Sequence, residues 1–449
     1  MRGGGSNKVG LGWIAIMRIG LVQASIGAMV MLTTTVLNRL MVVEYTLAAA
    51  IPAGLVGWHY AVQLCRPLWG HGSDKGGNRS LWIMGGLIIL AAGSMLAVQV
   101  TILESDSMIY RVGLGILAYT LIGIGVGAGG TSALALLASG VAPPRRAAAA
   151  AVTWIMMIAG IVASAIAVSN LIDPFSPARL IWVAGGLLAV CLMVTAAAVF
   201  RLDRFGAASF SEAKKDAAPP DFRAAISEIF AEKAARRFTI FIFVSMMAFN
   251  MQDLILEPFA GLVFGMTPGE STALGGMQSG GILAGMIVAG IGGSAFAGRM
   301  PVELRHWIVF GCLGSALALA SLAIGAMAGP GWPIQVNVFA LGFCNGLFAV
   351  AAIGAMMGLA GAGEKTREGV RMGVWGASQA IAFGLGGLIG ALGVDIARQS
   401  LGHDGSAFQL IFAIEAALFV IAAGLAVRAT STAIASSRSE PDQEGEVFA

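Results

Sequence analysis

Four charged residues lie near the ends of two long apolar segments, in corresponding positions of the two halves of the chain. Arg39 and Glu44 end the first segment, and Asp253 and Glu257 lie toward the end of the segment that opens the second half. Charged side chains are costly within a bilayer, so they usually serve a function or hold the architecture together. Pro258 follows Glu257 directly and is expected to free a backbone carbonyl there. These residues could pair between helices or contact a bound molecule.

The composition restricts the chain to one class of protein. Of 449 residues, 57% are hydrophobic and only 11% are charged, and the mean hydropathy is +0.83. Soluble domains carry about 25% charged residues, so we expect a polytopic helical membrane protein. The net charge of +3 is too small to indicate a nucleic-acid partner. The four cysteines lie in apolar segments without metal-like spacing, which favours a role as small apolar side chains.

Twelve apolar segments have the length that a membrane-spanning helix requires. The sequence therefore predicts an all-α membrane protein of two parallel six-helix repeats. The expected parts are a cytoplasmic N-terminus (1–13), an N-terminal six-helix bundle (14–200), a cytoplasmic linker (201–237), a C-terminal six-helix bundle (238–427) and a disordered cytoplasmic tail (428–449). The expected spans are 14–43, 49–69, 81–102, 112–138, 148–171, 178–200, 238–264, 273–296, 307–328, 336–360, 370–396 and 408–427.

Positive charge is concentrated in alternate loops, which predicts the orientation. The loops after the even-numbered spans carry most of the arginine and lysine residues, including eight between 201 and 237. Because basic loops stay in the cytoplasm, both termini and the central linker are expected there. Within the linker, Phe222, Ile226, Ile229 and Phe230 follow helical spacing, which predicts an amphipathic helix at the membrane surface.

The loop after the second span has a recognisable pattern. The loop contains Gly70, then Asp74 four residues later, and it ends with the basic residue Arg79. This pattern resembles the loop between spans two and three of the major facilitator superfamily, although Lys75 stands where that family usually has arginine. The resemblance implies that Asp74 forms a cytoplasmic latch with cations of a neighbouring loop, for which Arg145 and Arg146 are the candidates.

Five short segments have distinctive sequences, namely Arg18 to Gln23, Leu37 to Glu44, Gly70 to Asp74, Gln252 to Phe259 and Val263 to Met266. Together they resemble the PucC/LhaA family, the bacteriochlorophyll delivery family of major-facilitator-like proteins in phototrophic bacteria. The resemblance extends from about residue 13 to residue 428. It implies an assembly factor for bacterial light-harvesting antenna complexes, which delivers bacteriochlorophyll to antenna polypeptides or chaperones them, in the intracytoplasmic photosynthetic membrane.

The resemblance also implies partners and a pigment. The expected partners are antenna polypeptides, with the reaction centre and bacteriochlorophyll synthase as further candidates, and bacteriochlorophyll is the expected cargo or bound pigment. Of the four histidines, His59 is the one well inside a predicted span. It could be an axial ligand of the pigment magnesium, but a histidine bonded to a neighbouring helix is the commoner arrangement. Arg39, Glu44, Asp253 and Glu257 could form a clamp between the two halves or contact pigment or antenna.

Glycines spaced four residues apart could let a flat ring approach a helix, or serve ordinary helix packing. The pairs are Gly123 and Gly127, Gly276 and Gly280, and Gly386 and Gly390. We find no catalytic triad, phosphate-binding loop or metal-ligand spacing, so the sequence predicts no enzyme and no metal or nucleotide site. The alternative function is a secondary transporter of a small hydrophobic or amphipathic solute. A transporter predicts a polar central cavity, whereas an assembly factor predicts apolar grooves facing lipid.

Overall fold

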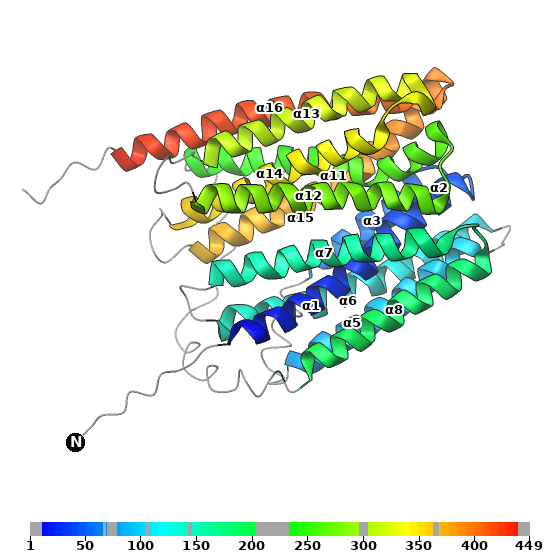
Figure 1. Ribbon diagram of the computed structural model, residues 1–449, viewed down its shortest axis with the longest axis horizontal. Coiled ribbons are helices and arrows are strands. Elements are labelled where there is room, and N and C mark those ends of the chain that lie inside the picture. Colours follow the sequence, from blue (N-terminus) through cyan, green and yellow to red (C-terminus); the bar gives the residue numbers. More distant parts are fainter. Residues whose placement is uncertain are drawn as a thin grey trace, which may run out of the picture.

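The computed structural model describes residues 11–65, 69, 79–103, 107–141, 146–200, 202, 233–295, 304–361 and 368–438, and every regular element in these ranges is a helix. Figure 1 shows two groups of long, roughly parallel helices, one from each half of the chain. The prediction of an all-helical membrane fold built from two halves is confirmed.

The first half begins with one interrupted helix. Its parts are α1 (Trp13–Met31), a π-helical segment (Leu32–Val36) and α2 (Leu37–Val43). The other helices of this half are α3 (Ala50–Gln63), α5 (Arg79–Ile102), α6 (Met108–Gly140), α7 (Arg146–Ile172) and α8 (Pro177–Val199). The second half consists of α11 (Lys233–Phe264), α12 (Pro268–Ala295), α13 (Leu304–Ala328), a short 3-10 turn (Gly329–Gly331), α14 (Ile334–Gly361), α15 (Glu368–Leu401) and α16 (Asp404–Arg438).

One predicted span corresponds to a helix that is shorter than a bilayer requires. Within the described residues, 11 helices are long and apolar enough to cross a membrane. The twelfth, α3, has 14 residues, which correspond to about 21 Å at 1.5 Å per residue. The predicted span 49–69 is therefore represented by a shorter helix, which lies between the two halves in Figure 1.

Two predicted boundaries also differ from the structure. The last helix continues to Arg438, so the first part of the expected tail is helical, in keeping with the helix propensity of its alanines. Helix α11 begins at Lys233, within the expected linker. The predicted amphipathic helix around Phe222 lies outside the described residues.

Glycines allow the helices of each half to approach closely. A Cβ atom on Gly386 or Gly390 of α15 would lie 2.5 or 2.8 Å from backbone oxygens of α11, and one on Gly123 of α6 would lie 2.9 Å from the His59 oxygen of α3. These three predicted glycines therefore serve helix packing. A Cβ atom on Gly280 of α12 would meet no heavy atom within 4 Å, so this position is open.

The two halves contact each other through three main pairs of helices. Helix α7 packs against α12, α3 against α15, and α2 against α11. Each pair joins one helix of the first half to one of the second, so the boundary between the halves runs through the region that holds Arg39, Asp253 and Glu257.

Candidate functional site: a charged end and a central cavity

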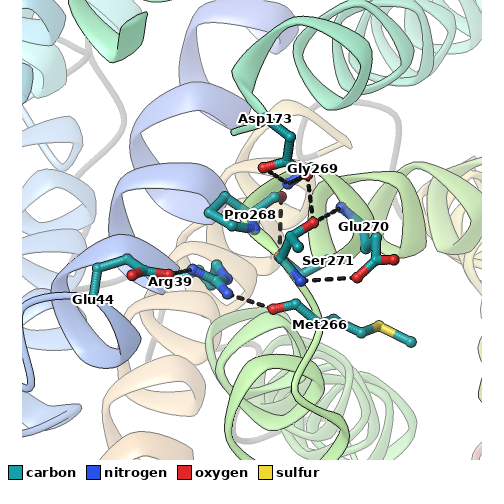
Figure 2. Close-up of polar contacts among 9 residues, drawn as sticks. Arg39, Glu44, Asp173, Met266, Pro268, Gly269, Glu270 and Ser271 are labelled. Carbon is teal, nitrogen blue, oxygen red and sulfur yellow. Dashed lines mark hydrogen bonds and ion pairs between the residues drawn. The ribbon is translucent and has the colours of Figure 1, made fainter. Parts of the chain in front are cut away.

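Arg39 joins the two halves at one end of the bundle. Its side chain is 2% exposed, and its Nη1 atom lies 2.6 Å from Oε1 of Glu44, the residue at the end of α2. Its Nη2 atom donates a hydrogen bond of 2.6 Å to the backbone oxygen of Met266, which follows α11 in the second half. Figure 2 shows this guanidinium between its two partners. The residue thus connects the halves through a backbone carbonyl.

The α11 chain makes room for this arginine at Gly261. A Cβ atom there would lie 3.2 Å from Nη2 of Arg39 and 2.9 Å from Val43. Next to Arg39 in the sequence, Asn38 donates a buried hydrogen bond of 2.7 Å to the backbone oxygen of Leu254. The segment Asn38 to Glu44 is therefore bound to the second half mainly through backbone acceptors, which a sequence pattern does not reveal.

Asp173 makes a second connection at this end. From the loop after α7 it accepts hydrogen bonds from the backbone nitrogen of Gly269, at 3.1 Å, and from the hydroxyl of Thr267. Thr267 and Glu270 also form a reciprocal capping box at the start of α12, with hydrogen bonds of 2.9 and 3.2 Å. An acid at a helix N-terminus is favoured by the helix dipole. Figure 2 shows Asp173 above this first turn.

Asp395 makes a third connection, in the opposite direction. It lies in α15 and accepts hydrogen bonds of 3.0 and 2.7 Å from the backbone nitrogens of Ala49 and Ala50, at the start of α3. Each half therefore places a carboxylate on a helix N-terminus of the other half. In the sequence, Asp173 and Asp395 lie near the ends of predicted spans, and their contacts with the other half were not predicted.

Asp253 and Glu257 do not share hydrogen bonds with Arg39. Arg39 lies within electrostatic range of Glu257, but its hydrogen bonds go to Glu44 and Met266. The expected clamp between Arg39 and Asp253 or Glu257 is thus replaced by a different set of partners. The two carboxyl groups instead line a cavity of about 200 Å³ between the halves.

Polar side chains from both halves surround this central cavity. They include Thr34 and Thr35 of the π-helical segment, Tyr60 of α3, Asn250 of α11, and Thr272, Gln278 and Ser279 of α12. The π-helical segment is held by hydrogen bonds, one of 2.8 Å from the hydroxyl of Tyr119 to the backbone oxygen of Thr33. The sequence did not predict this cluster, because its residues are scattered over four helical segments.

Glu257 is buried in this cavity without a hydrogen-bond partner. It is 2% exposed, and neither carboxyl oxygen has a partner among the described residues. A Cβ atom on Gly275 of α12 would lie 2.8 Å from its Oε1 atom, so only glycine leaves room for the carboxyl group. Glu415 of α16, which we did not single out in the sequence, is also fully buried without such a partner and interacts electrostatically with Asp253.

His59 lies at the contact between α3 and α6. It is buried, its Nε2 atom is 2.8 Å from Nε2 of Gln63, and its ring lies 5.0 Å from that of Tyr60. Because an amide nitrogen only donates, His59 Nε2 accepts this bond. A magnesium ligand at Nε2 would have to displace Gln63, and the role of His59 as an axial ligand stays a prediction.

The predicted cytoplasmic latch falls largely outside the described residues. Asp74 and Arg145 are not described, and of Arg146 only the backbone is. Arg79 donates a hydrogen bond of 2.7 Å to the backbone oxygen of Ala135. This bond joins α5 to α6 within the first half, so it does not connect the two halves.

An apolar groove lies on the outside of the contact between α3 and α15. Its volume is about 320 Å³. It is lined by Gly54, Gly57, Trp58, Tyr60, Ala61 and Leu64 of α3 and its C-terminal end and by Ile381, Gly384, Leu385 and Leu388 of α15. Trp58 and Leu64 are half exposed, and a Cβ atom on Gly57 would have only ordinary contact, 3.5 Å, with the Gly384 oxygen. The groove therefore has a glycine floor and apolar walls.

Solved structures with the same architecture are membrane transporters. The nucleoside transporter NupG matches with a TM-score of 0.67 and 13% identity over 93% of this chain and 99% of its own. A bacterial homologue of the human drug peptide transporters PepT1 and PepT2 matches with a TM-score of 0.66 and 13% identity over 95% and 99%. At such low identity the likeness establishes the fold alone, which is that of the major facilitator transporters.

Curated relatives match over nearly the whole chain. A Rhodobacter capsulatus protein named the bacteriochlorophyll synthase 44.5 kDa chain is 49% identical over 417 residues, 93% of this chain and 95% of the relative. Protein PucC of Rhodobacter capsulatus is 29% identical over 92% of this chain and 91% of its own. The family model described as PUCC protein matches residues 36–433. The chain therefore belongs to the PUCC family and is a multi-pass membrane protein.

Proposed function

We propose that this protein is a membrane assembly factor for bacterial light-harvesting antenna complexes, which delivers bacteriochlorophyll to antenna polypeptides, chaperones them, or does both. The observation that carries the proposal is the match of residues 36–433 to the PUCC family, together with a relative whose name refers to bacteriochlorophyll. Antenna polypeptides are the proposed main partners, with the reaction centre and bacteriochlorophyll synthase as further ones. The proposed location is the intracytoplasmic photosynthetic membrane, with both termini in the cytoplasm.

The groove between α3 and α15 supports this proposal by its shape. A flat, apolar ring needs a surface where small residues leave room and aromatic or aliphatic residues give contact. The room is left by the glycines Gly54, Gly57 and Gly384. The contact surface is provided by Trp58 and Leu385. His59 is not among the lining residues, so the groove residues would hold a ring by packing.

We propose a non-catalytic role, although one relative is named as a synthase chain. A protein that hands over or shelters a pigment needs a binding surface and no reacting groups. The direct check is whether the purified protein forms bacteriochlorophyll from its precursor, for which we expect no activity. Formation of the pigment by the protein alone would contradict this part of the proposal.

The experiment that tests the proposal is purification in mild detergent from a phototrophic host, followed by absorption spectroscopy and identification of bound polypeptides. We expect bacteriochlorophyll and antenna polypeptides to co-purify. Gly57→Leu should fill the groove and lower the amount of pigment per protein severalfold. Gly186→Leu on α8, where a Cβ atom has nothing within 4 Å, is the matched control and should leave that ratio unchanged. Absence of both pigment and polypeptides in the wild type would refute the proposal.

A secondary transporter is the second candidate, because the fold and the polar central cavity suit it. The cavity volume of about 200 Å³ is below the roughly 300–1,000 Å³ typical of sites for drug-sized ligands. The cavity in this conformation therefore fits an ion or a few waters better than an amphipathic solute. Uptake of such a solute by proteoliposomes, lost on Glu257→Gln, would favour the transporter.

A further inference from the structure

The central cavity contains more negative than positive groups. Arg39 acts electrostatically on Glu257, but its charge is already paired with Glu44. Asp253 and Glu257 lie one helical turn apart on the same face of α11 and both line the cavity. Two acids on the surrounding helices are bound elsewhere. Glu270 of α12 binds the nitrogen of Thr267, and Asp395 of α15 binds those of Ala49 and Ala50.

An ionised carboxylate in such a place requires a counter-charge. Glu257 is 2% exposed and its two oxygens have no hydrogen-bond partner in the described structure. Burying a carboxylate without compensation costs many kcal/mol, so the group must either take up a proton or bind a cation. Glu415 adds a further buried carboxyl group that acts on Asp253, which increases this requirement.

Neutral polar groups complete the lining. The Oγ1 atom of Thr272 and the Nε2 atom of Gln278 are buried without partners in the described structure, and both residues face the same cavity. The Thr272 hydroxyl oxygen is a hard ligand, as carboxylates are, whereas the Gln278 nitrogen is a hydrogen-bond donor and does not ligate a cation. Hard oxygen ligands suit Na⁺, Mg²⁺ and Ca²⁺, whereas sulfur and imidazole suit transition metals. Neither cysteine nor histidine is among the described residues that line the cavity.

The volume also fits a small ion. A water molecule occupies about 30 Å³ in the liquid, so a cavity of about 200 Å³ holds an ion with several waters. Because Arg39 is already paired with Glu44, the two lining carboxylates are balanced when one of them is protonated and a single monovalent cation neutralises the other. We propose that Asp253 and Glu257 bind a small hard monovalent cation, Na⁺ or a proton, in the central cavity between the two halves.

Cation binding would act on the contact between the halves. The carboxylates come from α11, whereas Thr34 and Thr35 come from the π-helical segment of the first half. An ion held among them attracts groups from both halves and stabilises the contact between the halves. This property is independent of pigment binding, so it can fail while the proposed function holds.

The test uses the full-length protein in detergent, exchanged into N-methyl-D-glucamine chloride at pH 8. NaCl, KCl or a lower pH is then introduced at constant ionic strength, and unfolding is followed by tryptophan fluorescence. We expect NaCl or acid to raise the wild-type Tm by about 2 °C or more, because a ligand of the folded state stabilises it. In weak buffer, a pH indicator reports whether Na⁺ displaces protons from the site.

Variants locate the site. Glu257→Gln keeps the shape of the side chain and removes its charge, so it should abolish the response or raise the half-saturating NaCl concentration about tenfold or more. Glu270→Gln on the adjacent helix keeps its capping role and should respond as the wild type does. If Glu257→Gln does not fold, Asp253→Asn and Thr272→Val test the same cavity, and each should weaken the response.

The outcomes are distinct. A response to Na⁺ with proton release identifies Na⁺ exchanging with a proton, and a response to pH alone that Glu257→Gln removes identifies the proton. Both support the proposal. A wild-type protein that responds to neither, or an unchanged response in both Glu257→Gln and Asp253→Asn, overturns it.

Discussion

Arg39 carries a buried positive charge whose partners lie on both sides of the boundary between the halves. Glu44 neutralises it from its own segment, and the Met266 oxygen binds it from the other half. Removal of one partner from a buried charge pair costs more than removal from an exposed pair, because water cannot replace the lost interaction. The contribution of Arg39 to the free energy of unfolding therefore depends on its burial.

Arg39→Leu should lower the free energy of unfolding by about 2–4 kcal/mol, through the loss of two charge-assisted hydrogen bonds. Denaturant unfolding in mixed micelles measures the change. Arg398 is the matched control because it makes a 2.6 Å pair with Asp404 but is one-third exposed. Arg398→Leu should cost less than about 1 kcal/mol. Equal losses in the two variants would show that the burial of Arg39 has no energetic effect.

Gly275 leaves the space that the Glu257 carboxyl group occupies. Gly275→Ala would place a Cβ atom 2.8 Å from Oε1, so the carboxyl group has to move, and we expect a loss of about 1–3 kcal/mol. Gly280→Ala on the same helix meets nothing within 4 Å and should be neutral or stabilising by up to about 1 kcal/mol. Thermal unfolding of both variants distinguishes them, and a stable Gly275→Ala would contradict the described position of Glu257.

Among the elements, α3 is the one that depends most on the rest of the structure. It has 14 residues, begins at Ala50 and packs against α6 and α15. Short helices are marginal by themselves and need packing or capping. Its N-terminal nitrogens of Ala49 and Ala50 are bound by Asp395, which is 345 residues from Ala50. The sequence predicts the helix, but the cap comes from the opposite half.

Asp395→Ala should expose the start of α3. We expect faster hydrogen exchange at the backbone of the Ala49–Ala50 region, and a loss of stability of about 1–2 kcal/mol, as for loss of a helix cap. Hydrogen-exchange mass spectrometry on peptides covering residues 45–55 measures the first effect. Asp404→Ala, at a partly exposed position at the start of α16, should leave that exchange unchanged. Unaltered exchange in Asp395→Ala would show that the carboxylate does not cap α3.

For the whole molecule, the contacts of Arg39, Asp173 and Asp395 all lie at one end of the bundle. The distribution of basic residues predicts that this end faces away from the cytoplasm. The molecule is thus held closed at this end by interactions between the halves. The apolar groove between α3 and α15 follows the same boundary, so opening of the halves would also alter the groove.

The orientation can be tested by labelling single cysteines in a Cys65→Ser background, because Cys65 is the exposed native cysteine within the described residues. Asp404→Cys, at the start of α16, should react with a membrane-impermeant maleimide in intact spheroplasts. Ser437→Cys, near the end of α16, should react only after lysis. The reverse pattern would invert the proposed topology.

The amino-acid sequence by itself determined the class of the protein, the number of apolar segments and the family resemblance. These follow from hydrophobic length and local motifs, which do not depend on how the helices are rotated. It also singled out Arg39, Glu44, Asp253 and Glu257, because charged side chains within a bilayer are costly and usually serve a function or hold the architecture together. It did not determine their partners.

Tertiary structure alone decided those partners. Whether Arg39 pairs with Glu44 or with Glu257 depends on how α2 and α11 are rotated and shifted relative to each other. Both helices are apolar on nearly all sides, so the pattern of hydrophobic residues determines neither their rotation nor their register. The contact from Asp173 to Gly269 spans 96 residues, and that from Asn38 to Leu254 spans 216. Glu257, expected in a clamp, lies without a hydrogen-bond partner among the described residues, in a cavity that exists only when the two halves are packed together. A cavity is a property of packing, so only the folded molecule reveals it.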